Sequence, residues 1–564
     1  MRTRSQRLLD LQEDLIAELL SYATVQELYM VLRCSKACRR HVEGAAARRA
    51  RRLYHRPLPA QPMMYWGGGR ESCLHGLHYL DALQAQELTS IAAGTAHSVL
   101  VRPADGQVFA CGSSEEVDED EHHELHLAVL AGAQADEEDI GSSSCLAQLG
   151  MGVLAGPPVL TPQPLIGLAG VLVREVAASS NHTLLLGACG GVWSCGIRFL
   201  MVRFEDDGVY ESLESACGHE LAAEWTVPRR IAAYCRPWEV DSDGAALRIP
   251  HHHVRICRIA ASATHSLLVC DEGHVYSCGD GDDGQLGHGD FEPKRIPTAI
   301  NPIFWEVVVS RERLTMHSVY GVRACQVSAH RGVSLAVTHK GALYSWGQGS
   351  PALGQGTKVY DDKWGHMRTN FGAPTRVAFP EHVRIKQAVA TNNRMLAVSR
   401  DGALYTCGTH PTCLGHGSSS FGPANTEDHP LCFVPRLVAT LPGKRVRAVA
   451  AGNGHNVVLT EAGEVFTFGK CRHYELGLST ADLPADMYED LLNGLQLTTA
   501  SVPTAVSALA GLLVVEVAAG ENHTIVRLAN GELRTFGADH YWQLGQADLE
   551  AEQTWTPGRV VLPA

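Results

Sequence analysis

Histidines are the residues of this chain most able to do chemistry, because an imidazole titrates near neutral pH and ligates metals. Two clusters, His122-His123-x-x-His126 and His251-His252-His253 with Cys257, have the residue types of a metal site but no defined ligand framework. Five others end one recurring motif, written Ile91-Ala-Ala-Gly-Thr-Ala-His97 in its first copy; they are His97, His182, His265, His455 and His523. A side chain required in five repeats is expected to hold a turn, so we interpret these five as structural.

No pattern for a P-loop, a dinucleotide site, a nucleophile elbow or a zinc ribbon occurs with the required spacing. The sequence therefore predicts a protein that is not an enzyme, with no catalytic residue, no cofactor and no metal. The last repeat runs directly to Ala564, so we also expect no catalytic-cysteine ligase domain.

The elements that position these histidines recur seven times. Two repeats carry Val333 and Arg394 in the histidine column, and a turn glycine follows eight residues later in six of the seven repeats. After the turn comes an alternating apolar run that ends in glycine, at Gly112, Gly196, Gly279, Gly347, Gly408, Gly469 and Gly537. Alternation with period two predicts strands, and the glycines between them predict hairpins.

A Gln-Leu-Gly landmark follows the apolar run in six repeats, as in Gln285-Leu286-Gly287 and Gln543-Leu544-Gly545, and we find none in the second repeat. A proline-bearing strand such as Pro557-Gly-Arg-Val-Val561 comes next. A unit of this size cannot bury its own sheet faces, so it must stack on copies of itself.

These three motifs, in this order, resemble the repeat of the regulator of chromosome condensation family over about residues 63–564. The resemblance implies an all-β fold, a seven-bladed β-propeller, here preceded by a small N-terminal helical domain. Column-to-column spacings of 61 to 85 residues exceed the ~40–45 of another common propeller repeat, so the excess must be loop. Tyr65-Trp66-Gly67 looks like half of an extra repeat, which leaves open how residues 63–88 close the ring.

Composition limits the environment of the protein. Seventeen cysteines are an odd number, and four of them share one repeat column and are expected to be buried core thiols: Cys111, Cys195, Cys278 and Cys407. This usage favours a reducing compartment, so we expect a cytoplasmic or nuclear location. No signal peptide or membrane span is found. The acidic insert 115–143 has too few apolar residues to form a core.

Residues 1–56 differ in charge from the rest, with a net of about +6 against about −20 for the remainder, and residues 57–62 form a linker to the propeller at 63–564. Asp10-Leu-Gln-Glu13 and Thr24-Val-Gln-Glu27 are capping boxes that open two amphipathic helices. Together with Cys34-Ser-Lys-Ala-Cys-Arg-Arg-His41 they resemble an F-box, and the alternative that the residues leave open is a plain amphipathic helical cap. That resemblance implies docking to the Skp-type adaptor of a cullin-RING ubiquitin ligase through Leu11, Leu15, Ile16, Leu19, Leu20, Leu28 and Val31.

Two hypotheses of function follow. The first is a protein–protein interaction module, the substrate-recognition subunit of a cullin-RING ligase, whose protein substrate is unknown. The alternative is a guanine-nucleotide exchange factor for a small GTPase, the activity that the family resemblance implies. The strongly acidic propeller argues against direct DNA binding. A photoreceptor of the plant ultraviolet-B type would need tryptophan-rich repeats, and the motifs at Asn181 and Asn522 lack tryptophan.

Overall fold

A computed structural model of the chain describes residues 91–102, 105–113, 149–152, 159–196, 199–205, 208–220, 225–240, 246–300, 323–356, 371–391, 393–409, 413–417, 432–479, 488–492, 495–546 and 553–563. The chain divides into two compact units, residues 1–87 and 88–564, and every described residue belongs to the second. The predicted N-terminal helical domain, the linker 57–62, the half-repeat 63–88 and the acidic insert 115–143 lie outside the described residues.

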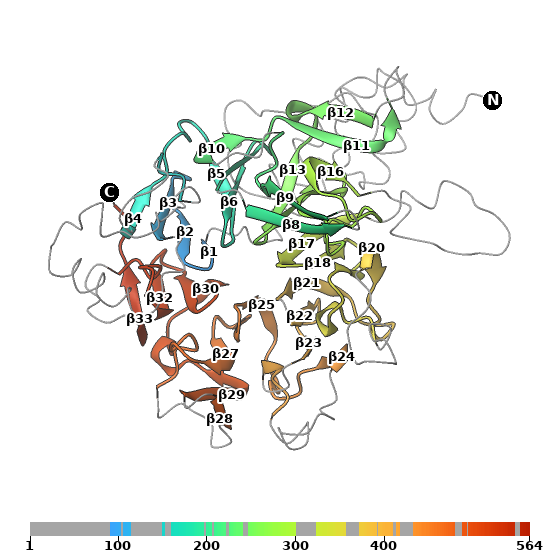
Figure 1. The fold of residues 1–564 in the computed structure, drawn as a ribbon. Helices are drawn as coiled ribbons and strands as arrows, with labels where there is room; N and C mark the ends of the chain where they lie inside the picture. The colour runs from blue at the N-terminus through green and yellow to red at the C-terminus, as the bar shows by residue number, and fades with distance from the viewer. Residues whose placement is uncertain are drawn as a thin grey trace, which may run out of the picture. The chain divides into compact units, whose positions relative to one another are not determined.

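The described part of the second unit is a ring of seven antiparallel sheets, which we call blades 1 to 7 (Figure 1). Each blade takes its four ring strands from one repeat, in chain order from the centre of the ring outward. The seven-bladed all-β propeller expected from the sequence is thus confirmed. Residues described here include no α-helix, and so none long and apolar enough to cross a membrane.

The strands of the first four blades have these bounds. Blade 1 is β1 (Ile91–Ala93), β2 (His97–Val101), β3 (Val108–Gly112) and β4 (Val159–Pro164). Blade 2 is β5 (Val173–Ala178), β6 (His182–Gly187), β7 (Val192–Gly196) and β10 (Trp225–Arg230). Blade 3 is β13 (Ile256–Ala261), β14 (His265–Cys270), β15 (Val275–Gly279) and β16 (Lys294–Ala299). Blade 4 is β17 (Ala324–His330), β18 (Val333–Thr338), β19 (Leu343–Gly347) and β20 (Phe371–Arg376).

The remaining three blades complete the ring. Blade 5 is β21 (Ile385–Ala390), β22 (Arg394–Ser399), β23 (Leu404–Gly408) and β24 (Cys432–Leu437). Blade 6 is β25 (Val446–Ala451), β26 (His455–Thr460), β27 (Val465–Cys471) and β29 (Leu495–Ala505). Blade 7 is β30 (Val514–Ala519), β31 (His523–Leu528), β32 (Leu533–Ala538) and β33 (Gln553–Val560).

Each blade has two ends, which define two faces of the ring. The residue of the histidine column starts the second strand and pairs with the glycine that ends the third, as His265 does with Gly279. The turn between the first two strands and the landmark loop after the third therefore share one face, which we call the motif face. The opposite face carries the turns between the second and third strands, and we call it the hairpin face.

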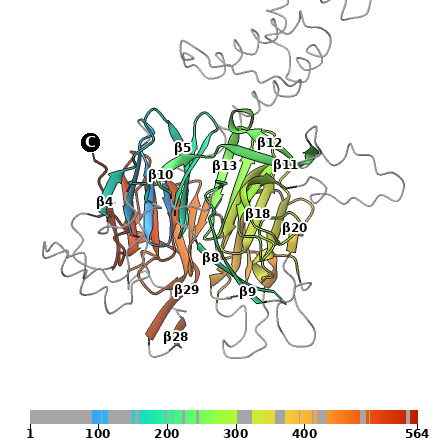
Figure 2. The same cartoon turned by 45° about the horizontal axis from the view of Figure 1, so that its top comes forward.

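Three strand pairs were not expected from the repeat. The β8–β9 hairpin (Phe199–Glu205 and Gly208–Glu214) and strand β28 (Tyr488–Leu492), which pairs with β29, arise from landmark loops and so lie on the motif face. The β11–β12 hairpin (Ala233–Val240 and Ala246–Pro250) precedes blade 3 and extends its sheet from β16. Figure 2 shows β8–β9 and β28–β29 at one end of the blades and β11–β12 at the other.

The closing glycines have a stereochemical reason. Gly279 adopts φ +112°, a backbone conformation that L side chains rarely take, and a Cβ there would overlap the carbonyl oxygen of Thr264. The other six closing glycines have φ between 108° and 153° and an equally close carbonyl. Glycine at this column allows the chain to leave the third strand while passing close to the backbone that begins the second strand.

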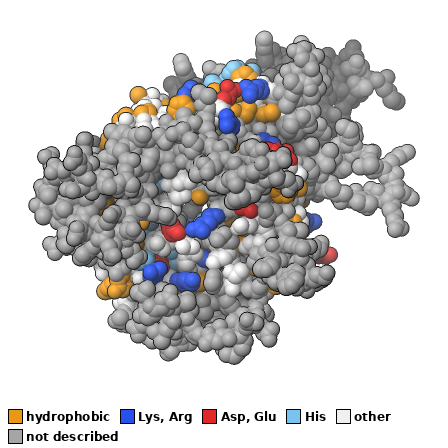
Figure 3. Space-filling model, viewed as in Figure 1, with side chains coloured by type: hydrophobic (Ala, Val, Ile, Leu, Met, Phe, Trp, Pro, Cys, Tyr) orange, Lys and Arg blue, Asp and Glu red, His pale blue; other side chains and the backbone are white. Residues whose placement is uncertain are grey.

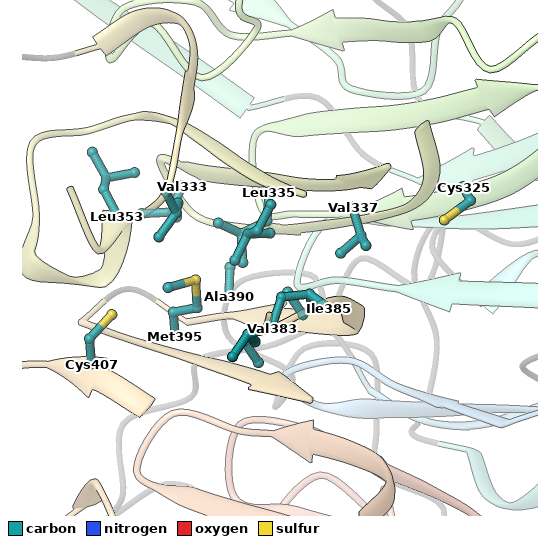
Figure 4. Close-up of a cluster of buried hydrophobic side chains, with 14 residues drawn as sticks. Cys325, Val333, Leu335, Val337, Leu353, Val383, Ile385, Ala390, Met395 and Cys407 are labelled. Carbon is teal, nitrogen blue, oxygen red and sulfur yellow. The ribbon is translucent and has the colours of Figure 1, made fainter. Parts of the chain in front are cut away.

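The hydrophobic core consists of clusters between neighbouring blades. The largest in the described part of the chain joins blades 4 and 5, and Figure 4 shows Val333, Leu335 and Val337 of blade 4 facing Ile385 and Ala390 of blade 5. Blades 7 and 1 share another cluster, in which Ile91 and Phe109 pack near Ile525. The ring is therefore closed by direct packing of the last blade on the first. The four column cysteines are buried thiols outside any disulfide, as expected: Cys111, Cys195, Cys278 and Cys407.

Candidate functional site

The five column histidines lie at the inner rim of the ring, where each crosses to the next blade. Their Nε2 atoms approach the hydroxyl oxygen of a serine or threonine in the second strand of that blade. The pairs are His97 with Thr183 at 3.2 Å, His182 with Ser266 at 2.7 Å, His265 with Ser334 at 2.8 Å, His455 with Thr524 at 3.0 Å and His523 with Ser98 at 3.0 Å. The last pair spans the closure between blades 7 and 1.

The direction of these bonds follows from the hydroxyls. Ser334 donates to the carbonyl of Gln285 at 2.7 Å, and Ser98 donates to that of Gln543 at 2.6 Å. A hydroxyl has one proton, so it must accept from the imidazole, and Nε2 carries the hydrogen. Burial lowers the pKa of His97 to about 4 and that of His265 to about 3. These histidines are neutral at physiological pH and join blades to one another.

Two blades depart from this pattern. Arg394 of blade 5 is 1% exposed and reaches blade 6, where its Nε donates to Oδ1 of Asn456 at 2.8 Å. Its terminal nitrogens donate to three backbone carbonyls of the next turn, those of Asn453, Gly452 and His455, at 2.7, 2.8 and 2.9 Å. Val333 of blade 4 instead belongs to the apolar cluster that also contains Met395 of blade 5.

The landmark missing from the second repeat is present in the structure. Ser194 donates to the carbonyl of Cys217 at 2.6 Å, as Ser277 of the next blade does to Leu286 at 2.7 Å. Gly218 then has φ +79°, matching +80° at Gly287. Ala216-Cys217-Gly218 therefore replaces Gln-Leu-Gly. The contact uses backbone carbonyls, so the side-chain types did not reveal it.

Buried carboxyls support the landmark loops. Burial raises the pKa of Asp539 to about 8, and its Oδ1 accepts from the backbone N–H of Leu544 at 2.8 Å. Burial also raises the pKa of Glu475 to about 7, and this carboxyl accepts from the N–H groups of Arg472 and His473 at 3.1 and 2.6 Å. Perturbed acids can signal catalysis. Both of these are bound within their own loops.

The mouth of the central channel is the polar cavity of the motif face. Its volume is about 510 Å³, and the turns between the first and second strands of the blades surround it. Arg331 of blade 4 and Glu521 of blade 7 meet across it, with a guanidinium nitrogen 3.6 Å from a carboxylate oxygen. Figure 3 shows acidic and basic side chains together in the hollow at the centre of this face. This ion pair connects blades on opposite sides of the ring.

Arg331, at the edge of this cavity, has an uncommon backbone conformation. This residue has φ +44°, and its carbonyl accepts from the hydroxyl of Ser262 at 2.8 Å. Glu521 is fixed on its other side, because Nδ2 of Asn453 donates to it at 3.1 Å. The pair is partly exposed, with side-chain exposures of 53% and 24%, so it adds little to stability and is open to a ligand.

Of the two histidine clusters with a possible metal role, only one lies among the described residues. His251, His252 and His253 form one 3-10 turn, η2, with ring centroids 5.6 and 4.1 Å apart along the series. No group of three or more potential ligands converges anywhere among the described residues. His122, His123 and His126 lie outside them, as do the seven predicted adaptor-binding residues.

Sequence comparison identifies the repeats. The profile of the regulator of chromosome condensation (RCC1) repeat matches residues 272–337, 401–459 and 462–527, and a second profile of that repeat matches 256–285 and 514–543. Ultraviolet-B receptor UVR8 of Arabidopsis thaliana is 29% identical over 298 residues, covering 52% of this chain and 56% of the receptor. The E3 ubiquitin-protein ligase HERC2 of Mus musculus is 28% identical over 328 residues, covering 56% of this chain and 5% of the ligase. The chain thus spans little more than half of the receptor and a small part of the ligase.

Solved structures show the same fold. Yeast RCC1 (Prp20), from its crystal structure with Kap60, superposes with a TM-score of 0.57 at 18% identity, covering 86% of each chain. Human WBSCR16 gives a TM-score of 0.50 at 22% identity, covering 73% of this chain and 86% of that one. The described blades thus form a seven-bladed propeller, and the two profiles of the regulator of chromosome condensation repeat match residues 256–337, 401–459 and 462–543 of it.

Proposed function

We propose that the propeller captures a protein substrate on its motif face and that residues 1–56 connect it to a cullin-RING ubiquitin ligase through a Skp-type adaptor. The observation that supports capture is the variety of side chains around the mouth of the central channel. The turn between the first and second strands is repeated in every described blade, but the residue at its centre differs from blade to blade. At that position stand Thr95, Ser180, Ala263, Arg331, Asn453 and Glu521 in the six blades where it is described.

The contacts of the ring support binding over catalysis. The column histidines are neutral and bonded between blades, and the perturbed acids Glu475 and Asp539 are bonded within their loops. Arg331 and Glu521 instead face a cavity that is open at one end of the channel. We propose that the protein is not an enzyme, needs no cofactor, and works in the cytoplasm or the nucleus.

The ligase connection rests on the sequence pattern of residues 1–56. In the helix that the sequence predicts, Leu15 and Leu19 would lie one turn apart on the proposed docking stripe, so two carboxylates there would be desolvated in an apolar interface. The named ligases among the relatives, HERC2 and HERC6, match this chain over 5% and 24% of their own lengths. The adaptor must therefore be tested directly.

The test is co-purification with the Skp-type adaptor. We expect the full chain to retain the adaptor, residues 57–564 to lose it, and Leu15→Asp/Leu19→Asp to bind it at least tenfold more weakly, because central apolar anchors each contribute about 2 kcal/mol or more. Gln6→Asp/Ser21→Asp adds the same charge outside the apolar stripe and should bind normally. Equal binding by all four proteins, or none by the full chain, rejects the ligase proposal.

Guanine-nucleotide exchange on a small GTPase is the second candidate. Its support is similarity: one human relative, 26% identical over 285 residues, is named an RCC1-like G exchanging factor-like protein. The chain covers 52% of that relative. The assay is release of a fluorescent guanine nucleotide from a panel of small GTPases, with Arg331→Glu/Glu521→Arg as the channel-mouth variant. Acceleration by the wild type that this variant removes would favour exchange over ligase recruitment.

A further inference from the structure

A second cavity opens on the hairpin face, where blade 4 meets blade 5. Its volume is about 420 Å³. Its floor contains Leu343, Val377 and Val383, which are also members of the large apolar cluster between these blades. Its walls carry four cationic side chains and one acidic one, namely Arg323, Lys340, Arg376, Arg384 and Glu381. The cavity thus joins an apolar base to a strongly basic rim.

The basic rim is not neutralised by neighbouring acids at its outer positions. Lys340 and Arg376 are exposed and make no ion pair with any described residue. Arg384 is held in place by the backbone, since one terminal nitrogen donates to the carbonyls of Glu381 and Val383, at 2.5 and 3.0 Å. Among the residues that the structure describes, no carboxylate pairs with this guanidinium.

The next junction around the ring provides an internal control. Between blades 5 and 6, Asp401 precedes the turn glycine, where blade 4 has Lys340. Leu437 pairs with Tyr405, where blade 4 pairs Arg376 with Tyr344. Two cations at this junction are matched, because Nζ of Lys444 lies 2.7 Å from a carboxylate oxygen of Glu464 and Nε of Arg445 lies 3.1 Å from one of Glu461. The two basic positions of Lys340 and Arg376 are therefore not repeated at the junction of blades 5 and 6.

We propose that this cavity binds an acidic peptide segment of a partner protein, with an apolar side chain on the floor and flanking carboxylates on the rim. The basic rim is complementary to carboxylates and the apolar floor to an apolar side chain, and both belong to the same cavity. A chain with a formal net charge of −14 repels a long polyanion, whose binding depends on the summed field. A short peptide interacts with the local cations and also buries apolar surface, which a phosphate group cannot do.

This site is separate from the proposed substrate face. The channel mouth and the landmark loops belong to the motif face, whereas the cavity is lined by the β18–β19 turn and by the link that enters β21. The inference therefore holds or fails independently of the ligase proposal. It gives the propeller two protein-binding faces.

The test is fluorescence anisotropy with the full chain and a fluorescein-labelled nonapeptide of alternating glutamate and leucine. Lys340→Asp/Arg376→Leu introduces the residues that blade 5 already carries at these positions, so the fold should tolerate them. We expect wild type to bind the peptide, the variant to bind at least tenfold more weakly, and the glutamine version of the peptide to bind as weakly as the variant.

A charge-matched control removes two cations from elsewhere in the propeller, in Lys444→Asp/Arg559→Leu, and should keep wild-type affinity. Equal losses in both variants would show that overall charge drives binding and would overturn the proposal. Displacement of the peptide by millimolar inorganic phosphate, or preference for a single-stranded oligonucleotide of equal charge, would also overturn it. Circular dichroism melting of both variants verifies that they are folded.

Discussion

Two neighbouring junctions, that of blades 4 and 5 and that of blades 5 and 6, have the same strand arrangement but differ in the polarity of the side chains between the blades. At the inner rim the first is apolar, with Val333 and Met395 in one cluster, and the second is polar, with Arg394 bonded to Asn456. On the hairpin face the first has a basic cavity, and the second has matched ion pairs. The same strand frame therefore accepts different side chains at a few positions, and these decide whether a junction is apolar or polar at this column and whether its cations on the hairpin face are paired.

Arg394 shows how a buried cation is accommodated without a carboxylate. Burial lowers its pKa, yet a guanidinium stays charged in proteins. Its three nitrogens donate to Oδ1 of Asn456 and Asn393 and to three backbone carbonyls. The side chain of Asn456 is itself held, because its Nδ2 donates to the carbonyls of Cys413 and Phe468, so the charge is solvated by oriented dipoles. Asn456 stands where five other junctions have a serine or threonine, and the arginine also donates to backbone carbonyls of the next turn.

The largest expected effect is from Arg394→Met, which breaks the polar junction. It removes the donor from the buried carbonyl of Gly452 and from the amide oxygen of Asn456, and each buried group left without a donor costs about 1–3 kcal/mol. We expect the free energy of unfolding to fall by more than about 3 kcal/mol, measured by urea denaturation. The exposed Arg400→Met, on the hairpin face of the same blade, should change it by under about 1 kcal/mol. Similar losses in the two variants would contradict the role assigned to Arg394.

Met395→Ala removes packing from the apolar junction and should lower the free energy of unfolding somewhat less than Arg394→Met does. Met395 is fully buried, and truncation of a buried methionine typically costs about 2–5 kcal/mol because a cavity remains. We expect a loss of about 2–3 kcal/mol in the same denaturation experiment, with Met395→Leu within about 1.5 kcal/mol of wild type. A loss in Met395→Leu as large as that in Met395→Ala would mean that packing volume is not what this junction requires.

Two substitutions would convert the apolar junction of blades 4 and 5 into a histidine–hydroxyl junction. Val333→His alone places an imidazole beside Met395, where its N–H has no acceptor, and should cost about 1–3 kcal/mol. Adding Met395→Ser supplies the hydroxyl used at five other junctions, and the introduced hydroxyl can donate to the landmark carbonyl of Ala352. We expect the double variant to regain at least about 1 kcal/mol over the sum of the two single changes, measured as a double-mutant cycle. Strict additivity would show that the histidine–hydroxyl pair does not transfer between junctions.

The sequence predicted the ring better than its sites. Period-two alternation and closing glycines located the ring strands, because strand faces and φ values constrain side-chain type directly. The Ala216-Cys217-Gly218 landmark was missed because its contacts use backbone carbonyls. The basic cavity was missed because Lys340 lies in the β18–β19 turn and Arg376 at the end of β20, and only the fold brings both to one cavity. Arg394 was placed in its column, but its acceptors are mostly backbone atoms of the next blade.

The smallest expected effect is a difference in acid sensitivity. Burial lowers the pKa of His182, His455 and His523 to about 3, below the ~6.5 of an exposed imidazole. A group whose pKa is depressed on folding contributes stability that is complete above the unfolded pKa and is lost as pH falls toward the folded one. The native histidine junctions should therefore weaken between about pH 6.5 and pH 4, whereas the junction of blades 4 and 5 has no imidazole at this position to protonate.

The Val333→His/Met395→Ser variant adds a sixth such imidazole, so its stability relative to wild type should fall as the pH is lowered. One buried histidine that stays neutral at pH 5 costs up to about 2 kcal/mol there, from 1.36 kcal/mol per pKa unit below the unfolded value. Denaturation at pH 7 and pH 5 measures this difference. Buried carboxyls act in the opposite direction, because the raised pKa of Asp539 makes its contribution fall as pH rises toward about 8. Asp539 is present in both proteins and cancels, so a gap that stays constant from pH 7 to pH 5 would mean that the new imidazole is not buried as the native ones are.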